Sequence, residues 1–448
     1  MIGNYKEQKG LTRKQKEAVG LLSVGTFLEY FDLMLYVHMA VFLNELFFPK
    51  YDPHTTAIYS ATAFCSGFVF RPVGALIFGW IGDNIGRKTT VIITTFIMAL
   101  SCLIIANLPT YAQIGITAPW LLTICRIIQG ISSMGEVIGV QLYLTEFINP
   151  PSQYPAVSSI SVFSTLGGVA ALGIASLVTS YGFNWRIAFW MGASVALAGT
   201  VARRSLRETP EFANTKRQLK KTLQQTSNVA GIYLKKLENN PIWKEKANKV
   251  TIIALFLIEC MCPVCFYFSY IYCGNMLKNS FGYTAEQVIH QNFIISIFSF
   301  LSTLVLTYLS YKIYPLKIVK TLLLIFCLFA LACPYLLNNL NNSFDVFLIQ
   351  LVVMLFVPNG PSTGQPIYYK HFPVFKRFSC ASLTFAISRA LMFLVTSFLI
   401  VYLTEYWHHW GIMMILFPVC IGFAFGLFHF EKLEKKTGNY PQKLHVEV

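Results

Sequence analysis

Twelve long, mostly apolar stretches recur along this 448-residue chain, and they restrict its fold more than any other feature. A helix of about 20 apolar residues spans the hydrocarbon core of a bilayer. Backbone polar groups in lipid must be hydrogen-bonded within the protein, which favours helices for such stretches. The predicted helices lie near 18–46, 55–80, 88–107, 118–146, 155–180, 186–202, 250–276, 287–310, 317–337, 344–368, 378–403 and 409–429.

The composition fits a membrane protein rather than a soluble one. Hydrophobic residues make up 55% of the chain and charged residues 12%, against about 25% charged residues in soluble domains. We therefore predict an all-α membrane protein with twelve transmembrane helices in two six-helix bundles. The predicted segments are an N-terminal bundle at 1–202, a cytoplasmic linker at 203–249, a second bundle at 250–430 and a cytoplasmic tail at 431–448.

The positive charge is distributed unevenly over the predicted loops. The formal net charge is +15, and 29 of the 35 Lys and Arg residues fall on one side of the predicted topology. Cytoplasmic loops carry such an excess. We therefore predict a protein of the cell (inner) membrane with both termini in the cytoplasm. The polar, basic first 16 residues and the long apolar run after them predict no cleavable signal peptide. We expect the protein to be a monomer that contacts the lipid bilayer. We expect no nucleic-acid partner.

The segment between the second and third predicted helices combines glycines with charges. Glycine permits tight turns and close helix approach, while the charges lie at the membrane surface. Two interpretations follow: a basic loop that fixes the topology, or a charged latch between helices that move. The residues concerned are Gly79, Gly82, Asp83, Gly86, Arg87 and Lys88.

This pattern, G-x-x-x-D-x-x-G-R-K, resembles the signature loop of the major facilitator superfamily of secondary transporters. The resemblance implies the major facilitator fold. It also implies that Asp83 and Arg87 lock neighbouring helices together on the cytoplasmic side, with Glu146 as the partner of Arg87. In the second half, the loop at 308–317 occupies the corresponding place but lacks the Gly and Asp of the pattern.

Seven ionisable residues fall inside the predicted helices. An ionisable side chain costs about 2.5–3.5 kcal/mol at the centre of a bilayer, so each is expected to face a partner or water rather than lipid. Structural ion pairing explains any one of them alone; convergence at one depth favours a proton and substrate site. The residues are Glu29, Asp32, Glu136, Glu259, Arg71, Arg126 and Arg389.

Helical spacing gives these groups expected neighbours. Arg126, Gln129 and Glu136 lie on one face of the fourth helix. Ten residues of helix separate Arg126 from Glu136 by about 15 Å, so the two do not pair directly. Glu29 or Asp32 of the first helix is the predicted partner of Arg126.

Prolines interrupt the tenth predicted helix between 358 and 366. Such a break exposes backbone and the side chains of Asn359 and Gln365 to a cavity, with a simple kink as the alternative. The acids Glu29, Asp32, Glu136 and Glu259 are the predicted proton-coupling residues. The predicted substrate-binding residues are Arg71, Arg126, Gln129, Arg389, Asn359 and Gln365.

Longer segments of the first half resemble the metabolite:proton symporters, a subfamily that includes proline/betaine, shikimate, citrate and 2-oxoglutarate carriers. The matching segments are 25–32, 71–74, 126–136 and 184–189. The resemblance implies proton-coupled uptake of a small carboxylate-bearing solute, such as proline or betaine, by alternating access. Uptake of a di- or tricarboxylate (2-oxoglutarate, citrate) or of shikimate is the alternative within this class.

Two other classes remain open from the sequence. Cys262 and Cys265 form a C-x-x-C pair that a membrane thiol oxidoreductase would use, and a non-transporting solute receptor would keep the same fold. We expect no enzyme activity, no cofactor and no metal. Aromatic residues that would cage a quaternary ammonium include Trp190, Tyr267, Tyr270, Tyr368 and Tyr369.

Overall fold

The structure is a computed structural model, and it describes residues 8–48, 66–181, 184–206, 208–209, 213–214, 217, 246–358 and 363–441. Within these ranges, nine helical segments are long and apolar enough to cross a membrane. The shorter apolar helices α8 (Arg186–Ala202) and α17 (Ser343–Phe356), together with α3 (Arg71–Asn84), provide three more crossing segments. The predicted all-α membrane fold with twelve crossings is confirmed.

The first half of the chain forms one bundle. Its other helices are α1 (Arg13–Phe47), α4 (Arg87–Asn107), α5 (Tyr111–Ile114), α6 (Thr117–Phe147) and α7 (Gln153–Tyr181), followed by the 3₁₀ turn η1 (Arg203–Ser205).

The second half forms the other bundle, with several helices that run on from one another. It contains α12 (Lys249–Glu259), α13 (Met261–Phe266), η2 (Tyr267–Tyr272), α14 (Cys273–Phe281), α15 (Ala285–Lys312), α16 (Pro315–Asn338), α18 (Gln365–Lys370), α19 (Val374–Leu394), η3 (Val395–Leu399), α20 (Ile400–Trp407), η4 (His408–Ile412) and α21 (Met413–Lys436).

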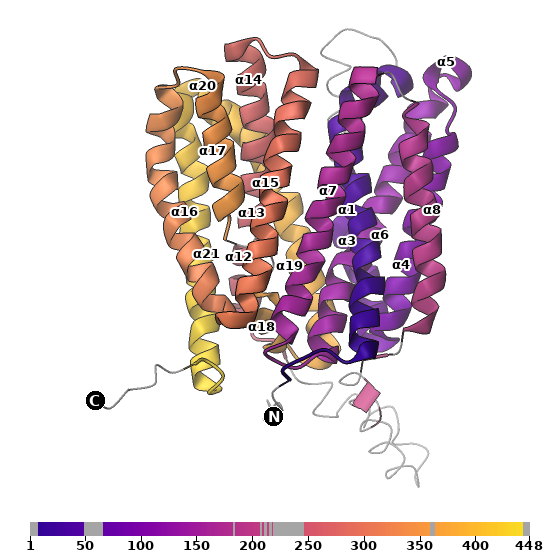
Figure 1. Ribbon diagram of the computed structural model, residues 1–448, viewed down its shortest axis with the longest axis vertical. Helices are drawn as coiled ribbons and strands as arrows, with labels where there is room; N and C mark the ends of the chain where they lie inside the picture. The colour runs from indigo at the N-terminus through magenta and orange to yellow at the C-terminus, as the bar shows by residue number, and fades with distance from the viewer. Residues whose placement is uncertain are drawn as a thin grey trace.

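The two bundles stand side by side, with α7 and α15 adjacent along the seam (Figure 1). Helix α19 packs on α3 across the same seam. Helix α1 begins and α21 ends at the same end of the molecule, the lower end in Figure 1. The functional groups described below lie at this seam and inside the first bundle.

Two boundaries differ from the sequence interpretation. Arg203, expected at the start of the polar linker, lies in η1 with a fully buried side chain. Helix α21 continues to Lys436, and its buried Glu431 and Glu434 belong to the helix rather than to a tail. A search for apolar runs ends a helix at the first charged residues. It therefore missed these charged side chains, which are packed inside the protein.

Helices α3 and α6 approach each other closely at glycines. A Cβ added at Gly130 of α6 would overlap the backbone carbonyl of Gly67, and a Cβ added at Gly74 would overlap the backbone of Ile131. Small residues permit such contacts between membrane helices, where packing rather than the hydrophobic effect drives association. The close approach brings the polar side chains of α3 and α6 within reach of one another.

We expect Gly130→Ala to lower the thermal stability of the purified protein, because overpacking a tight contact costs about 1–3 kcal/mol. Gly20→Ala on α1 is the matched control, since nothing lies within 4 Å of a Cβ added there. Alanine favours a helix over glycine by about 1 kcal/mol, so the control should melt at the same or a higher temperature. Equal melting temperatures for both variants would contradict the packing described here.

Candidate functional site

Asp32 of α1 and Arg126 of α6 form a buried ion pair inside the first bundle. Arg126 Nη1 lies 3.0 Å from Asp32 Oδ2 and donates to Gln129 Oε1 at 2.7 Å. The guanidinium also stacks on the Tyr36 ring, 4.0 Å from its centroid. Of the two partners that the spacing allowed for Arg126, the structure places Asp32 in the pair.

Glu29 and Arg71 are buried near this pair with unused hydrogen-bonding atoms. In the described part of the chain, Glu29 Oε2 and Arg71 Nε have no hydrogen-bond partner. The Arg71 guanidinium lies over the Phe68 ring, 4.7 Å from its centroid. Glu29, Asp32, Arg71, Arg126 and Gln129 line one small hollow within the first bundle.

Glu136 is paired with a residue that the sequence interpretation did not include. Arg203 Nη2 lies 2.8 Å from Glu136 Oε1, and Arg203 Nη1 lies 2.9 Å from Glu136 Oε2. Thr95 also donates to Glu136 at 2.8 Å. A Cβ on Gly25 would overlap both partners, so this glycine makes room for the pair. Both Glu136 oxygens are therefore occupied, unlike those of Glu29.

A cavity of about 150 Å³ lies between the two bundles. Its wall in the second half carries Glu259 of α12 and Arg389 of α19, whose Oε2 and Nη1 atoms are 3.0 Å apart. Gln365 of α18 donates to the other Glu259 oxygen at 2.7 Å. The Arg389 guanidinium stacks on Phe385, 3.3 Å from the ring centroid.

The ionisable residues lie in separate places. Glu259 and Arg389, with Gln365, line the central cavity, and Glu136 lines neither this cavity nor the small hollow beside Arg71. Arg389 interacts electrostatically with Glu29, so the cavity and the hollow are neighbours. The assignment of these residues to proton and substrate binding stays a prediction. Asn359 lies outside the described residues.

Cys262 and Cys265 are free thiols one helical turn apart on α13, and both line the central cavity. Among the described residues, no group of three His, Cys, Asp or Glu side chains has the arrangement of a metal site. Of the five aromatic residues considered for a cage, Tyr270 lines the central cavity, whereas Trp190 is 43% exposed on the outer surface.

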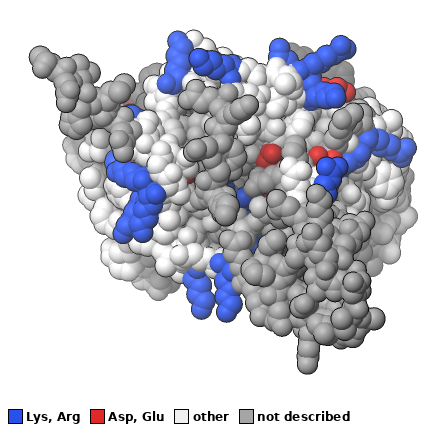
Figure 2. All heavy atoms as spheres, turned by 90° about the horizontal axis from the view of Figure 1, so that it is seen from below, with Lys and Arg blue, Asp and Glu red and all other residues white. Residues whose placement is uncertain are grey.

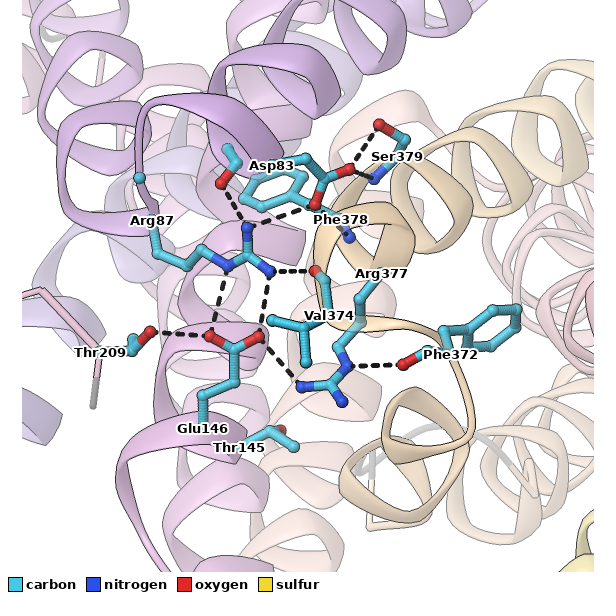
Figure 3. A network of polar contacts seen from close by, with 12 residues as sticks. Asp83, Arg87, Thr145, Glu146, Thr209, Phe372, Val374, Arg377, Phe378 and Ser379 are labelled. Carbon is cyan, nitrogen blue, oxygen red and sulfur yellow. Dashed lines mark hydrogen bonds and ion pairs between the residues drawn. The ribbon is translucent and has the colours of Figure 1, made fainter. Parts of the chain in front are cut away.

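Arg87 is the centre of a network at the lower end of the seam (Figure 3). Its guanidinium is fully buried and contacts two carboxylates, with Nη2 3.1 Å from Glu146 Oε1 and Nη1 3.2 Å from Asp83 Oδ1. It also donates to the Gly82 carbonyl and, at 2.8 Å, to the Val374 carbonyl of α19. The arginine of the signature loop thus contacts both bundles.

Asp83 and Glu146 also reach the second bundle. Asp83 accepts hydrogen bonds from the Phe378 and Ser379 amides at 3.1 and 2.9 Å, and from the Ser379 hydroxyl at 2.6 Å. Arg377 Nη1 lies 3.1 Å from Glu146 Oε1 (Figure 3). The loop and α19 therefore hold the two halves together at this end of the molecule.

The signature glycines have distinct roles in this network. Gly86 has φ +150°, a conformation that side chains rarely adopt, and the Glu208 carboxylate occupies the space of its missing Cβ. Glu208 accepts a hydrogen bond from the Arg87 amide at 3.0 Å, at the N-terminus of α4.

The other two glycines face α19. A Cβ on Gly82 would overlap the Phe378 ring, and a Cβ on Gly79 would press on Ser379. Lys88 donates to the Arg204 carbonyl at 3.0 Å.

The corresponding end of the second bundle uses a different carboxylate. Tyr314 donates to Glu434 Oε2 at 2.5 Å, and His371 Nε2 lies 2.8 Å from Glu434 Oε1. Burial together with the Glu434 charge raises the pKa of Tyr314, so the phenol remains a donor. Tyr314 belongs to the loop at 308–317, which corresponds to the signature loop but lacks its Gly and Asp.

Two six-helix halves around a central cavity, with ion pairs buried at membrane depth and a charged latch below, define a multi-pass membrane protein of the transporter type. The model of the Major Facilitator Superfamily matches residues 22–377, and the chain belongs to this family. This confirms the family that the loop at 79–88 predicted.

Comparisons with individual proteins agree with this assignment. The chain is 35% identical over 208 residues to a putative proline/betaine transporter of Staphylococcus haemolyticus, and 34% identical over 207 residues to a proline/betaine transporter of Salmonella typhimurium. These matches cover 44% of this chain in both cases, and 44% and 41% of the respective relatives. The chain thus matches less than half the length of these curated relatives.

Solved structures share the fold over nearly the whole chain. The proton:xylose symporter XylE superposes with a TM-score of 0.72 at 14% identity, over 94% of this chain and 95% of that one. The human organic anion transporter MFSD10 superposes with a TM-score of 0.62 at 14% identity, over 92% and 99% of the two chains.

The Glu136–Arg203 pair makes a double-mutant prediction. Arg203→Met leaves a buried carboxylate without its charge partner, which costs about 3–5 kcal/mol. Arg203→Met combined with Glu136→Leu removes both charges and should recover most of the melting temperature. A double variant as unstable as the single one would show that the arginine acts through its packing or through its bonds to the Leu21 and Leu22 carbonyls.

The latch predicts faster amide exchange in Asp83→Asn. The asparagine side chain loses a charged acceptor for the Phe378 and Ser379 amides, so hydrogen–deuterium exchange over 374–382 should accelerate. Asp345→Asn is the control, because Asp345 accepts hydrogen bonds only at the start of α17, from the Asn341 and Asn342 amides. Unchanged exchange over 374–382 in Asp83→Asn would argue against a latch at this place.

Proposed function

We propose that this protein is a proton-coupled carrier that takes up a small carboxylate-bearing solute, such as proline or betaine, by alternating access. The single observation that carries the proposal is the buried Glu259–Arg389 pair on the wall of the cavity between the two halves. A buried cation at membrane depth is stabilised by a nearby anion rather than by bulk water. The Arg389 guanidinium is therefore a strong site for an anionic group that enters the cavity.

Arg389 is the proposed substrate-binding cation. Its Nη1 atom faces Glu259, and a solute carboxylate would compete with Glu259 for the guanidinium. A bidentate carboxylate is the preferred partner of such a group. Gln365 holds the second Glu259 oxygen, which orients that carboxylate and keeps it beside the arginine.

Glu29 is the proposed proton carrier of the first half. Burial disfavours the charged form of a carboxyl whose oxygens are not hydrogen-bonded, and Glu29 Oε2 has no hydrogen-bond partner in the described structure. Asp32 and Glu136 are instead paired with Arg126 and Arg203. We therefore propose that Glu29 carries the transported proton and that the neighbouring Asp32–Arg126 pair responds to the charge of Glu29.

The latch supports alternating access. Its bonds link the signature loop and α6 to α19 of the other half, so the cavity cannot open at the lower end until they break. We place this end in the cytoplasm. Figure 2 views it and shows basic side chains around the rim with few acidic ones, as the positive-inside rule requires. The proposed carrier alters no covalent bond in its substrate.

Transport by purified protein in proteoliposomes tests the proposal. An inward proton gradient should drive accumulation of at least one carboxylate from a panel of proline, betaine, shikimate, citrate and 2-oxoglutarate. A receptor of the same fold would bind a solute without accumulating it. A thiol oxidoreductase would lose its activity on replacement of Cys262 and Cys265 by Ala, whereas carrier activity should persist.

Glu29→Gln should abolish accumulation driven by a proton gradient while solute exchange at equal pH continues, because the amide cannot gain or lose the transported proton. Glu17→Gln on the same helix is the control: Glu17 is exposed at the end of α1. Proton-driven accumulation by Glu29→Gln at the wild-type level would remove Glu29 from the mechanism.

A further inference from the structure

One wall of the central cavity consists of hydroxyl groups that the proposed mechanism does not use. Helices α7 and α15, adjacent along the seam (Figure 1), each turn a run of Ser and Thr toward the cavity. The residues are Ser161, Ser164 and Thr165 of α7 and Ser296, Ser299, Ser302 and Thr303 of α15. The charged pair of α12 and α19 lies on the wall of the same cavity.

Several of these hydroxyl groups have already used their hydrogen atoms. Ser164 donates to the Ser161 carbonyl at 2.8 Å, and Thr303 donates to the Ser299 carbonyl at 2.8 Å. Ser296 donates in the same way to a carbonyl of its own helix at 2.7 Å. A hydroxyl that donates to its own helix keeps lone pairs that accept hydrogen bonds. This wall therefore presents acceptors to whatever enters the cavity.

Ser161 and Ser299 stand out within this wall. Their exposed fractions are only 5% and 8%, and in the described part of the chain neither hydroxyl has a hydrogen-bond partner. Both residues line the cavity, so a solute there can reach hydroxyl groups that have no bond to give up. A solute with hydrogen-bond donors at this place would satisfy both groups.

We propose that the central cavity is selective for small carboxylates whose other end carries N–H or O–H donors, and that it discriminates against a fully methylated nitrogen. The inference rests on the proposed function, since Arg389 takes the carboxylate end, and it narrows that function to solutes such as proline, at the expense of betaine, whose nitrogen is fully methylated. A quaternary ammonium has no donor, so it would displace water from Ser161 and Ser299 without replacing its hydrogen bonds. The hydroxyl wall thus sets the substrate class.

Four aromatic side chains line the cavity, those of Tyr30, Phe266, Tyr270 and Phe385. Phe266 and Tyr270 lie together on one side, with ring centroids 5.1 Å apart. The face of Phe385 carries the Arg389 guanidinium. A quaternary ammonium site needs several free ring faces around one point, and the hydroxyl wall of α7 and α15 occupies part of the remaining lining.

A methylation series tests the selectivity directly. Proline, N-methylproline and N,N-dimethylproline share a ring and a carboxylate but carry two, one and no N–H donors. Shikimate and its tri-O-methyl ether form the corresponding O–H pair. Uptake into proteoliposomes and thermal stabilisation of the purified full-length protein would be measured for each solute. Affinity should fall with every donor removed in the series that binds.

Two variants test whether the hydroxyl groups of Ser161 and Ser299 cause this dependence on solute donors. Ser161→Ala and Ser299→Ala should each weaken binding of the donor-bearing solute by about 3- to 10-fold, the loss of one hydrogen bond. They should leave the fully methylated solute unchanged. Ser159→Ala is the control, because this hydroxyl donates to the Ala156 carbonyl at 2.7 Å and is not part of the cavity lining.

The outcomes separate this inference from the proposed function. A fully methylated solute that binds as well as its donor-bearing parent, or equal losses for both solutes in the Ser variants, would overturn the selectivity but leave the carrier intact. Donor-dependent stabilisation without accumulation would support the selectivity and overturn the carrier. A protein that neither binds nor accumulates any member of either series would overturn both.

Discussion

The cost of burying charge without water governs the design of this molecule. Each Arg inside the bilayer needs a carboxylate or an aromatic face nearby, and Arg87, Arg126, Arg203 and Arg389 all have a carboxylate within about 3 Å of a guanidinium nitrogen. These partners lie on different helices, so each pair also fixes the position of one helix against another. The same pairs thereby place the cavity walls, the first-bundle hollow and the latch.

Pairing also divides the acids by what they can do. A carboxylate held by an arginine is stable as an ion and resists protonation, whereas one without a partner favours its neutral form. Glu136 has two guanidinium nitrogens and a hydroxyl around it, whereas Glu29 Oε2 has no hydrogen-bond partner in the described part of the chain. Residues of one chemical type on neighbouring helices thus have different surroundings.

The sequence predicted the helices well because long apolar runs are local signals. The run at 186–202 coincides with α8, and the run at 88–107 with α4 except for one residue. It also limited the partner of Arg126 to Glu29 or Asp32, since the distance along the helix excludes Glu136, but it did not choose between the two. Pairings between distant segments were harder: nothing local distinguishes Ser379, whose hydroxyl and amide bind Asp83, from other serines. Arg203 was assigned to the linker because it follows an apolar run, although its side chain turns back into the bundle.

Glu146 gives the latch a property that no single ion pair has. One of its oxygens accepts from Arg87 of its own half and from Arg377 of the other, and Thr209 donates to its second oxygen. Loss of the Arg377 contact would leave Glu146 paired with Arg87 of its own half. The shared oxygen therefore lowers the cost of breaking the contact between the halves, because the buried carboxylate would not be left without a cation.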